Sequence, residues 1–208
     1  MAELFANFTD FLLRKGTYKG TENKKDMLEN IISLFSYLID KDMFLMVHRN
    51  ILARRLLSEK SEDIDLERLF ISNLKVACGM QEVNKLQGMM QDYGIIKEET
   101  KEYEAHLEKL QSNSEEVDTL GCTFQCLKTA NWPNYKQLVV SLPPQLDAKF
   151  NSFKRFYENK HQKRKITICF SLGEGLVAMH QSNKPKPNEL KCSTLSMLIL
   201  LLFNDSDV

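Results

Sequence analysis

The sequence lacks a net charge and a long apolar run, and these two absences exclude several classes of protein. Its 28 Lys and Arg residues equal its 28 Asp and Glu residues, so no overall field draws nucleic acid or a membrane to the whole surface. The longest apolar run, residues 195–203, is far shorter than the roughly 20 residues that span a bilayer. Hydrophobic residues make up 43% and charged residues 27% of the chain, as in an ordinary globular protein.

The five cysteines are scattered and odd in number, unlike the framework of a disulfide-rich secreted domain. Cys122 and Cys126 are four residues apart, but no second pair follows to complete a zinc site. The first 15 residues lack the basic start, the apolar stretch and the cleavage site of a signal peptide. We therefore expect free thiols, no metal, and a location in the cytoplasm, the nucleus or both.

Familiar catalytic motifs are absent from the sequence as well. No GxxxxGK(S/T), GxSxG, HExxH or GxGxxG pattern occurs. The four histidines show no ligand spacing, and His48 lies on an apolar helix face, where a hydrogen-bonded packing role is expected. Cys169 is a conceivable nucleophile, but it alternates with apolar residues as an ordinary strand residue does. The sequence predicts a protein that is not an enzyme and needs no cofactor.

Apolar residues recur every three or four positions through the first half of the chain, which predicts helices. The pattern covers residues 4–12, 27–39, 42–52 and 66–77, and a longer stretch runs from residue 83 to about residue 110. On the first helix the predicted apolar stripe consists of Leu4, Phe5, Phe8, Phe11 and Leu12. Gly79 is expected to end the fourth helix. Several helices with short connections predict a bundle.

The pattern changes after the polar segment 111–118. Residues 122–127 predict a short strand and residues 144–158 a helix. Alternation at residues 166–170, glycines at 173 and 175, and residues 176–179 predict a β-hairpin. A brief strand at residues 190–192 then leads to a helix at residues 195–203, which Ser193 or Thr194 can cap.

These elements predict an α+β fold that is mostly helical. We expect a helical bundle joined to a small α+β unit. The main boundary is expected between about Gln111 and Leu120.

Two local basic clusters stand out against the neutral total. One consists of Arg14, Lys15 and Lys19 with Lys24 and Lys25, and the other runs from Lys154 to Lys165 with a single acidic residue. Such clusters are often solvated helix faces. The functional alternatives are contact with nucleic-acid phosphates and docking of an acidic partner protein.

Four stretches of the sequence together resemble the homology region of the cullin family. Residues 34–44 (LFSYLIDKDMF) and 52–57 (LARRLL) look like the family pattern F-x-Y-I-x-D-K-D-x-F followed by L-A-K-R-L. Residues 74–79 (LKVACG), with the segments KL and MQD that follow, are similar to a second pattern. Trp132-Pro133, Leu142-Pro143 and the aromatic and basic residues from 153 to 165 make the third stretch, and residues 190–204 make the fourth.

The resemblance implies a non-catalytic scaffold of a RING-type ubiquitin ligase. Its fold would be a cullin-like helical bundle over residues 1–115, a small α/β domain over residues 116–192 and, in residues 193–208, the first helix of an incomplete winged-helix module. The resembling region starts inside the bundle and stops one helix into that module. We therefore expect neither the family's adaptor-binding repeats nor its modifier-accepting lysine in these 208 residues.

The resemblance also implies partners and site residues. In cullins the N-terminal strand of a RING-box protein joins the sheet of the α/β domain, and the RING recruits a ubiquitin-charged E2 enzyme. The RING-box-binding residues carried over to this sequence are Ile166, Ile168, Phe170, Leu176 and Val177. Arg14, Lys15 and Lys19 fall where the family carries a basic patch that attracts an acidic E2 tail. The alternative function is a nucleic-acid-binding module that acts through the stretch from Lys154 to Lys165.

Overall fold

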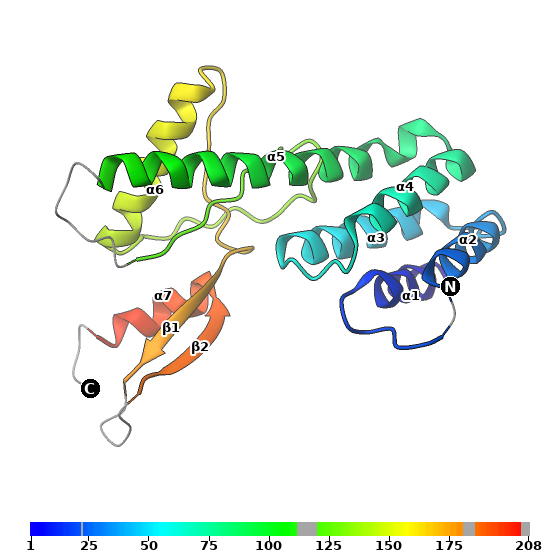
Figure 1. The fold of residues 1–208 in the computed structure, drawn as a ribbon, viewed down its shortest axis with the longest axis horizontal. Coiled ribbons are helices and arrows are strands. Elements are labelled where there is room, and N and C mark those ends of the chain that lie inside the picture. Colours follow the sequence, from blue (N-terminus) through cyan, green and yellow to red (C-terminus); the bar gives the residue numbers. More distant parts are fainter. Residues whose placement is uncertain (22, 112–119, 181–185, 205–208) are drawn as a thin grey trace. The chain divides into compact units, whose positions relative to one another are not determined.

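The computed structural model of the protein describes residues 1–21, 23–111, 120–180 and 186–204 (Figure 1). Within them the chain forms seven helices and one two-stranded antiparallel sheet. In chain order the elements are α1 (Ala2–Leu13), α2 (Lys24–Phe35), α3 (Lys41–Leu57), α4 (Ile64–Cys78), α5 (Met80–Gln111), α6 (Pro144–Lys160), β1 (Glu174–Met179), β2 (Asn188–Ser193) and α7 (Thr194–Leu202). The predicted α+β, mostly helical class is confirmed. None of the described helices is long and apolar enough to cross a membrane.

The chain divides into two compact units. Among the described residues, the first unit contains 1–106 and 125–133, and the second contains 107–124 and 134–204. The chain therefore enters the second unit near the end of α5, returns to the first unit for one short segment, and then passes back into the second. The predicted limits of the three domains stay a prediction.

Local signals set the helix ends of the first unit. The side chain of Asn23 accepts a hydrogen bond from the backbone N–H of Lys25 (3.1 Å) at the start of α2, so it satisfies a donor that the first turn leaves open. Gly79 has a φ of +92° and ends α4 as predicted, because glycine reaches this region without a steric penalty.

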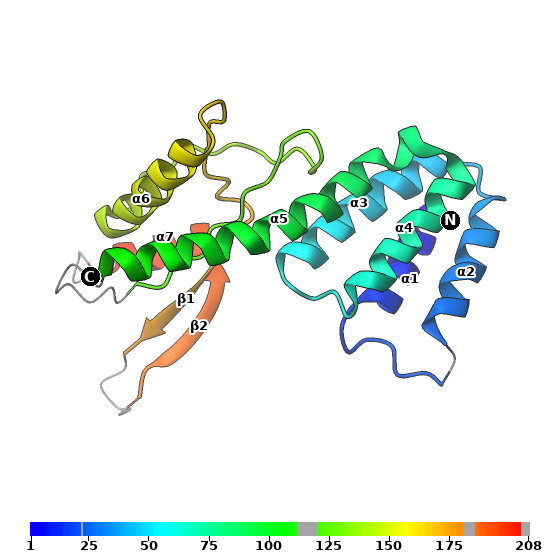
Figure 2. The ribbon, with the colours of Figure 1, turned by 45° about the horizontal axis from the view of Figure 1, so that its top comes forward.

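The core of the first unit is one apolar cluster to which α1 to α5 contribute. α1 packs against α2 and α3, and α2 packs against α4 (Figure 2). The rings of Phe35 and Phe44 meet at a centroid distance of 5.1 Å. Its fully buried members include Leu12, Phe35, Phe44, Leu52, Leu56, Phe70 and Leu74. The spacing that predicted these helices therefore also marks most of their buried faces.

The predicted apolar stripe of α1 is only partly correct. Leu12 is buried, but Leu4, Phe8 and Phe11 are exposed. α1 instead buries its small residues Ala2 and Ala6 together with Thr9 and Leu13. Small side chains allow a neighbouring helix to approach closely. The buried face of α1 is therefore turned away from most of the large apolar residues on which the predicted stripe is based.

His48 is completely buried in this core. Its ring stacks on Phe44 with a centroid distance of 5.6 Å and lies 5.3 Å from the ring of Phe70. Neither ring nitrogen has a hydrogen-bond partner among the described residues, so the packing role is as predicted but its expected hydrogen bond is not found. Burial, followed by the positive charge of Arg55, lowers the pKa of His48 from 6.5 to about 3.

The second unit confirms the predicted helices and corrects the strands. α6 covers the expected residues, and the Ser193 hydroxyl caps α7 by accepting from the N–H of Ser196 (3.2 Å). Residues 122–127 do not form the predicted strand. Phe124 instead stacks on Phe153 of α6, with the ring centroids 4.5 Å apart, so this extended segment packs against a helix.

The predicted hairpin is also wrong in its pairing. Residues 166–169 form no strand, and β1 pairs with β2 rather than with the segment before it. The predicted strand at residues 190–192 is confirmed as part of β2. Alternating apolar and polar residues fit any extended segment with two different faces, so alternation alone does not identify the partner strand.

We expect His48 to make the stability of the protein depend on pH below about 6.5. The unfolded chain protonates this histidine near pH 6.5, whereas the folded chain does so only near pH 3. The contribution of neutral His48 is therefore complete above pH 6.5 and is lost as the pH falls toward 3. The loss should be about 1.4 kcal/mol per pH unit.

Urea unfolding between about pH 4 and pH 7 measures this effect. The free energy of unfolding of the native chain should fall more steeply with acid than that of His48→Gln. The matched control is His180→Gln, at an exposed histidine, whose profile should follow the native one. Parallel profiles for the native chain and His48→Gln would contradict the expectation.

Candidate functional site

The second unit carries a short two-stranded hairpin. β1 and β2 pair antiparallel, with Glu174 opposite Ser193 and Met179 opposite Asn188. Among the described residues this sheet has only two strands, so neither strand has a further strand along its outer edge. Such an edge presents alternating N–H and C=O groups that a strand of another chain can bind.

One face of the hairpin is covered by α7. Gly175 lies opposite Cys192, and a Cβ atom at Gly175 would overlap with Sδ of Met197 in α7. The absence of a side chain at Gly175 therefore lets α7 lie close against β1. Val177, two residues further along β1, is on the same face and is half-buried.

The opposite face of the hairpin is exposed. It carries Leu176, whose relative exposure is 68%, opposite Lys191 of β2. The ammonium of Lys191 pairs with the carboxylate of Glu174 (2.6 Å), and both side chains face solvent. A partner strand at the edge of β1 would extend this exposed face as well as the covered one.

The five predicted RING-box-binding residues are divided between β1 and the segment before it. Leu176 and Val177 lie in β1. Ile166 and Ile168 are half-buried and Phe170 is buried, in a segment that forms no strand. The structure thus brings two of the five to the hairpin, and the contact of all five with a partner stays a prediction.

The predicted basic patch lies in the loop that joins α1 to α2. Its backbone is tied to the loop between α3 and α4: Lys15 donates to the carbonyl of Lys60 (2.8 Å), and Arg14 and Ser61 form an isolated antiparallel bridge. Gly16, with a φ of +74°, makes the turn that follows. The basic loop is therefore held by long-range hydrogen bonds.

The basic residues of this loop differ in how far their charge is already matched by acidic residues of the chain. Arg14 pairs with Asp10 (2.6 Å), so part of its charge is matched within the chain. Lys15 and Lys19 are exposed. The backbone bridge adds the exposed Lys60, which the sequence reasoning missed because it is far away in the chain and near in space.

A buried ionic cluster lies beneath the loop. Nε and Nη2 of Arg55 donate to the two carboxylate oxygens of Glu67 (2.6 and 2.8 Å), and Nη1 donates to Asp10. The Ser61 hydroxyl donates to the same Glu67 (2.7 Å). Asp10 therefore binds Arg55 and Arg14 together, which connects the cluster to the basic loop.

The electrostatics of Arg55 follow from this arrangement. Burial by itself would lower the pKa of the guanidinium, but the hydrogen bonds and charges of Glu67 and Asp10 raise it above its ordinary value. Arg55 stays charged at 1% exposure. A buried ion is tolerated only when such partners complete its hydrogen bonds.

The second basic stretch, from Lys154 to Lys165, covers the last turns of α6 and the five residues after this helix. Lys163 and Lys165 are exposed, and Nη1 of Arg164 lies 3.3 Å from the hydroxyl oxygen of Tyr157. This stretch has the exposure and local contacts of an ordinary helix end and the turn after it. The nucleic-acid alternative stays a prediction.

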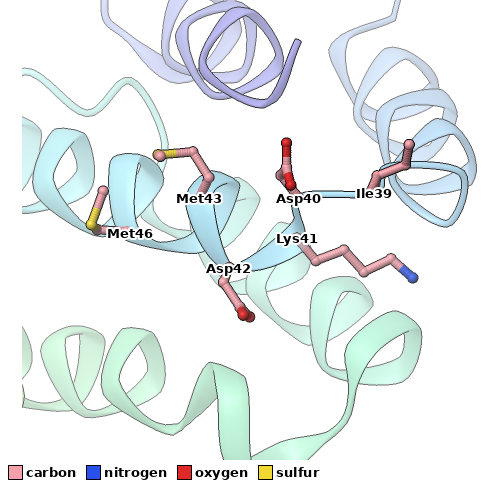
Figure 3. A pocket seen from close by; sticks show the side chains of 6 residues that line it. All are labelled: Ile39, Asp40, Lys41, Asp42, Met43 and Met46. Carbon is pink, nitrogen blue, oxygen red and sulfur yellow. The ribbon is translucent and has the colours of Figure 1, made fainter.

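A surface hollow at the start of α3 offers no convergent chemistry. It is lined by Ile39, Asp40, Lys41, Asp42, Met43 and Met46 (Figure 3). The carboxylates of Asp40 and Asp42 point in opposite directions (Figure 3), and the ammonium of Lys41 lies 5.6 Å from the ring centre of Phe35. In the part of the chain that the structure describes, no group of three His, Cys, Asp or Glu residues is placed to hold a metal ion.

Comparison with known proteins covers most of the chain. Residues 1–100 match the sequence profile of the cullin alpha solenoid domain, and residues 126–208 match that of the cullin alpha+beta domain. The two matches follow one another in the order that the four resembling stretches predicted.

Relatives show the same similarity along nearly the whole chain. Cullin-1 of Oryza sativa subsp. japonica is 34% identical over 208 residues, which are 99% of this chain and 27% of the relative. Cullin-1 of Dictyostelium discoideum is 33% identical over 205 residues, 97% of this chain and 26% of the relative. Cullin-4A of Homo sapiens is 33% identical over 207 residues, 99% and 26% respectively. The chain spans about a quarter of the length of these curated relatives.

We expect Glu67→Gln to destabilise the first unit by about 3–5 kcal/mol, because it leaves the buried Arg55 without its bidentate carboxylate. The matched control is Glu62→Gln, which removes an ion pair between Lys24 and the more exposed Glu62 and should cost about 0–1 kcal/mol. Urea unfolding measures both changes. Equal losses for the two variants would contradict a structural role for the Arg55 cluster.

Proposed function

This chain belongs to the cullin family, and we propose that it forms part of the non-catalytic scaffold of a cullin–RING ubiquitin ligase. In this proposal it binds a RING-box protein by strand addition at the β1–β2 hairpin. The observation that carries the proposal is a sheet in which the described residues form two strands only, and one face of which α7 covers.

The edge of β1 is the proposed docking site. Main-chain hydrogen bonds from an added strand would order the partner, and its alternating side chains would supply specificity. Directly opposed side chains on neighbouring strands lie about 4.5–5.5 Å apart. One partner side chain would therefore cover the exposed Leu176, and the next would lie beside the half-buried Val177.

The basic loop is the proposed docking site for the acidic tail of an E2 enzyme. Exposed lysines attract an acidic chain at long range and raise its association rate more than its final affinity. Lys15 and Lys19 face solvent, and the backbone bridge places Lys60 beside Lys15. We therefore include Lys60 in the patch and assign Arg14 mainly to holding the loop through Asp10.

The proposed scaffold contributes geometry rather than chemistry. By binding a RING-box protein, which in turn recruits a ubiquitin-charged E2 enzyme, it would raise the effective concentration of the reacting groups. Such a role requires no catalytic side chain in this chain. It would be exercised in the cytoplasm, the nucleus or both.

We expect the chain to co-purify with a co-expressed RING-box protein, and Leu176→Asp to weaken that complex by about tenfold or more. Leu176 is already exposed, so the change should cost the folded chain little, whereas burial of a carboxylate against the partner strand is unfavourable. Titration calorimetry measures the affinity, and circular dichroism checks the fold.

The matched control for this experiment is Val139→Asp, at an exposed apolar residue outside the hairpin. It should bind the RING-box protein as the native chain does. A native chain that fails to co-purify would refute the proposed function. Full binding by Leu176→Asp would place the partner strand elsewhere.

We expect the double variant Lys15→Glu, Lys60→Glu to weaken binding of an acidic E2 tail peptide and to reduce the salt dependence of binding. Fluorescence anisotropy at several salt concentrations measures both effects. The double variant Lys85→Glu, Lys136→Glu, at two exposed lysines outside the loop, is the control for net charge. An identical loss with this control would show that binding depends on total charge and not on this loop.

A further inference from the structure

Three hydroxyl residues of the chain follow an arginine by three positions. They are Thr17 after Arg14, Ser58 after Arg55, and Thr167 after Arg164. An arginine at this spacing is a feature that basophilic protein kinases recognise, because acidic side chains of the kinase bind the guanidinium. The sequence presents the three hydroxyls as equivalent candidates, whereas the structure separates them.

The fold closes the candidate at Ser58. Its arginine, Arg55, is 1% exposed and is held by the carboxylates of Glu67 and Asp10. A kinase would have to remove this guanidinium from its buried ion pairs and leave the carboxylates behind, which is strongly unfavourable. The Ser58 hydroxyl also donates to the carbonyl of Arg54 (2.7 Å) at the end of α3.

The candidate at Thr17 is also engaged by the chain itself. Thr17 is half-buried, and its hydroxyl donates to the carbonyls of Phe11 and Arg14 (2.7 Å to Arg14). The preceding Gly16 has a φ of +74°, so the chain turns at this point. A kinase needs the acceptor hydroxyl at its catalytic aspartate, and these contacts would have to break first.

Thr167 differs from both because it is exposed in an irregular segment. Residues 166–169 form neither helix nor strand, and the three basic residues 163–165 before Thr167 are exposed as well. Ile166 and Ile168, on either side, are half-buried. Alternate residues of an extended chain point in opposite directions, so the hydroxyl of Thr167 can be reached without disturbing the packing of its neighbours.

We propose that Thr167 is the acceptor site of a basophilic protein kinase, with Arg164 and Lys165 as the residues that the kinase recognises. Oγ1 of Thr167 attacks the γ-phosphorus of ATP, and a new P–O bond forms there. The bond from the γ-phosphorus to the bridging oxygen breaks, its electron pair leaves with ADP, and the hydroxyl proton passes to the catalytic aspartate of the kinase. The phosphate adds a charge of about −1.5 to −2 next to two cations, which favours the modified chain.

Modification of Thr167 has a consequence that rests on the proposed function, although the site itself does not. Ile166 and Ile168 are among the residues predicted to contact a RING-box protein. A partner that covers these two side chains would also have to remove water from the phosphate between them, which is unfavourable. We therefore expect phosphorylation of Thr167 to weaken binding of a RING-box protein.

Phosphorylation of the intact chain tests the site. The probe is the purified catalytic subunit of the cyclic-AMP-dependent protein kinase with ATP, and mass spectrometry of proteolytic peptides locates the phosphate. Thr167 should be modified about tenfold faster or more than Thr17 or Ser58. Equal modification of Thr17 and Thr167, or no phosphate at Thr167, would overturn the proposal.

Short peptides separate the effect of the fold from that of the sequence. A peptide of residues 9–21 should be modified at Thr17 about tenfold faster or more than the intact chain is, because only the fold closes that site. A peptide of residues 159–171 should be modified at Thr167 about as fast as the intact chain. A large gain for the second peptide would show that the fold also closes Thr167 and would overturn the proposal.

Two charge variants of the intact chain test the recognition by the kinase. Lys165→Glu should lower kcat/KM for Thr167 by about tenfold or more, because it opposes the acidic side chains of the kinase. Lys136→Glu makes the same change of charge at an exposed lysine outside the segment and should leave kcat/KM unchanged. Equal values for the two variants would overturn the assigned recognition.

The last measurement is the affinity for a RING-box protein before and after treatment with the kinase. Treatment should weaken binding by the native chain by about tenfold or more and leave binding by Thr167→Ala unchanged. Unchanged affinity of the fully phosphorylated native chain would overturn the regulatory consequence. Because locating the phosphate involves no RING-box protein, failure of the site and failure of the proposed function are distinguishable.

Discussion

The charged Arg55 in the core of the first unit is the interaction on which the arrangement around it depends. Its guanidinium receives a carboxylate from α4 through Glu67 and one from α1 through Asp10. A buried ion pair of this kind adds little net stability compared with apolar residues, but loss of one partner leaves an uncompensated buried charge. Because Ser61 and Arg14 bind the same carboxylates, the cluster also fixes the two loops that carry Lys15 and Lys60. The surface charges of the proposed patch thus depend on a buried one.

Helix positions were predictable from the sequence because they depend on local periodicity and on capping residues such as Gly79. The buried face of α1 was not fully predictable. Large residues such as Phe8 dominate a sequence-based stripe, while the structure buries Ala6 and leaves Phe8 exposed.

Strand pairing was predicted wrongly because alternation of apolar and polar residues is a property of a single strand. A hairpin also requires the correct partner strand, which alternation does not identify. Lys60 was missed because only tertiary hydrogen bonds bring it to Lys15.

The hydrogen-bond partners of buried polar groups were also not predictable from the sequence. Trp132 entered the sequence reasoning as part of the third cullin-like stretch, and nothing in the sequence indicated that its indole donates to Asp92 of α5. His48 was expected on an apolar face, and it lies there with neither nitrogen hydrogen-bonded to a described residue. The sequence identifies each polar group. The free energy of burying that group depends on its hydrogen-bond partners, which are far away in the chain.

The hairpin connects these physical arguments to the proposed function. A two-stranded sheet is marginal by itself and needs a helix or a third strand for stability. α7 supplies the first of these on the face of Gly175, while Leu176 on the other face stays in solvent. A partner strand would supply the third strand. Any protein that binds only the folded hairpin also stabilises that hairpin. Family membership and the two-stranded sheet of the described residues therefore support the same proposal on independent grounds, one from sequence similarity and one from β-sheet geometry.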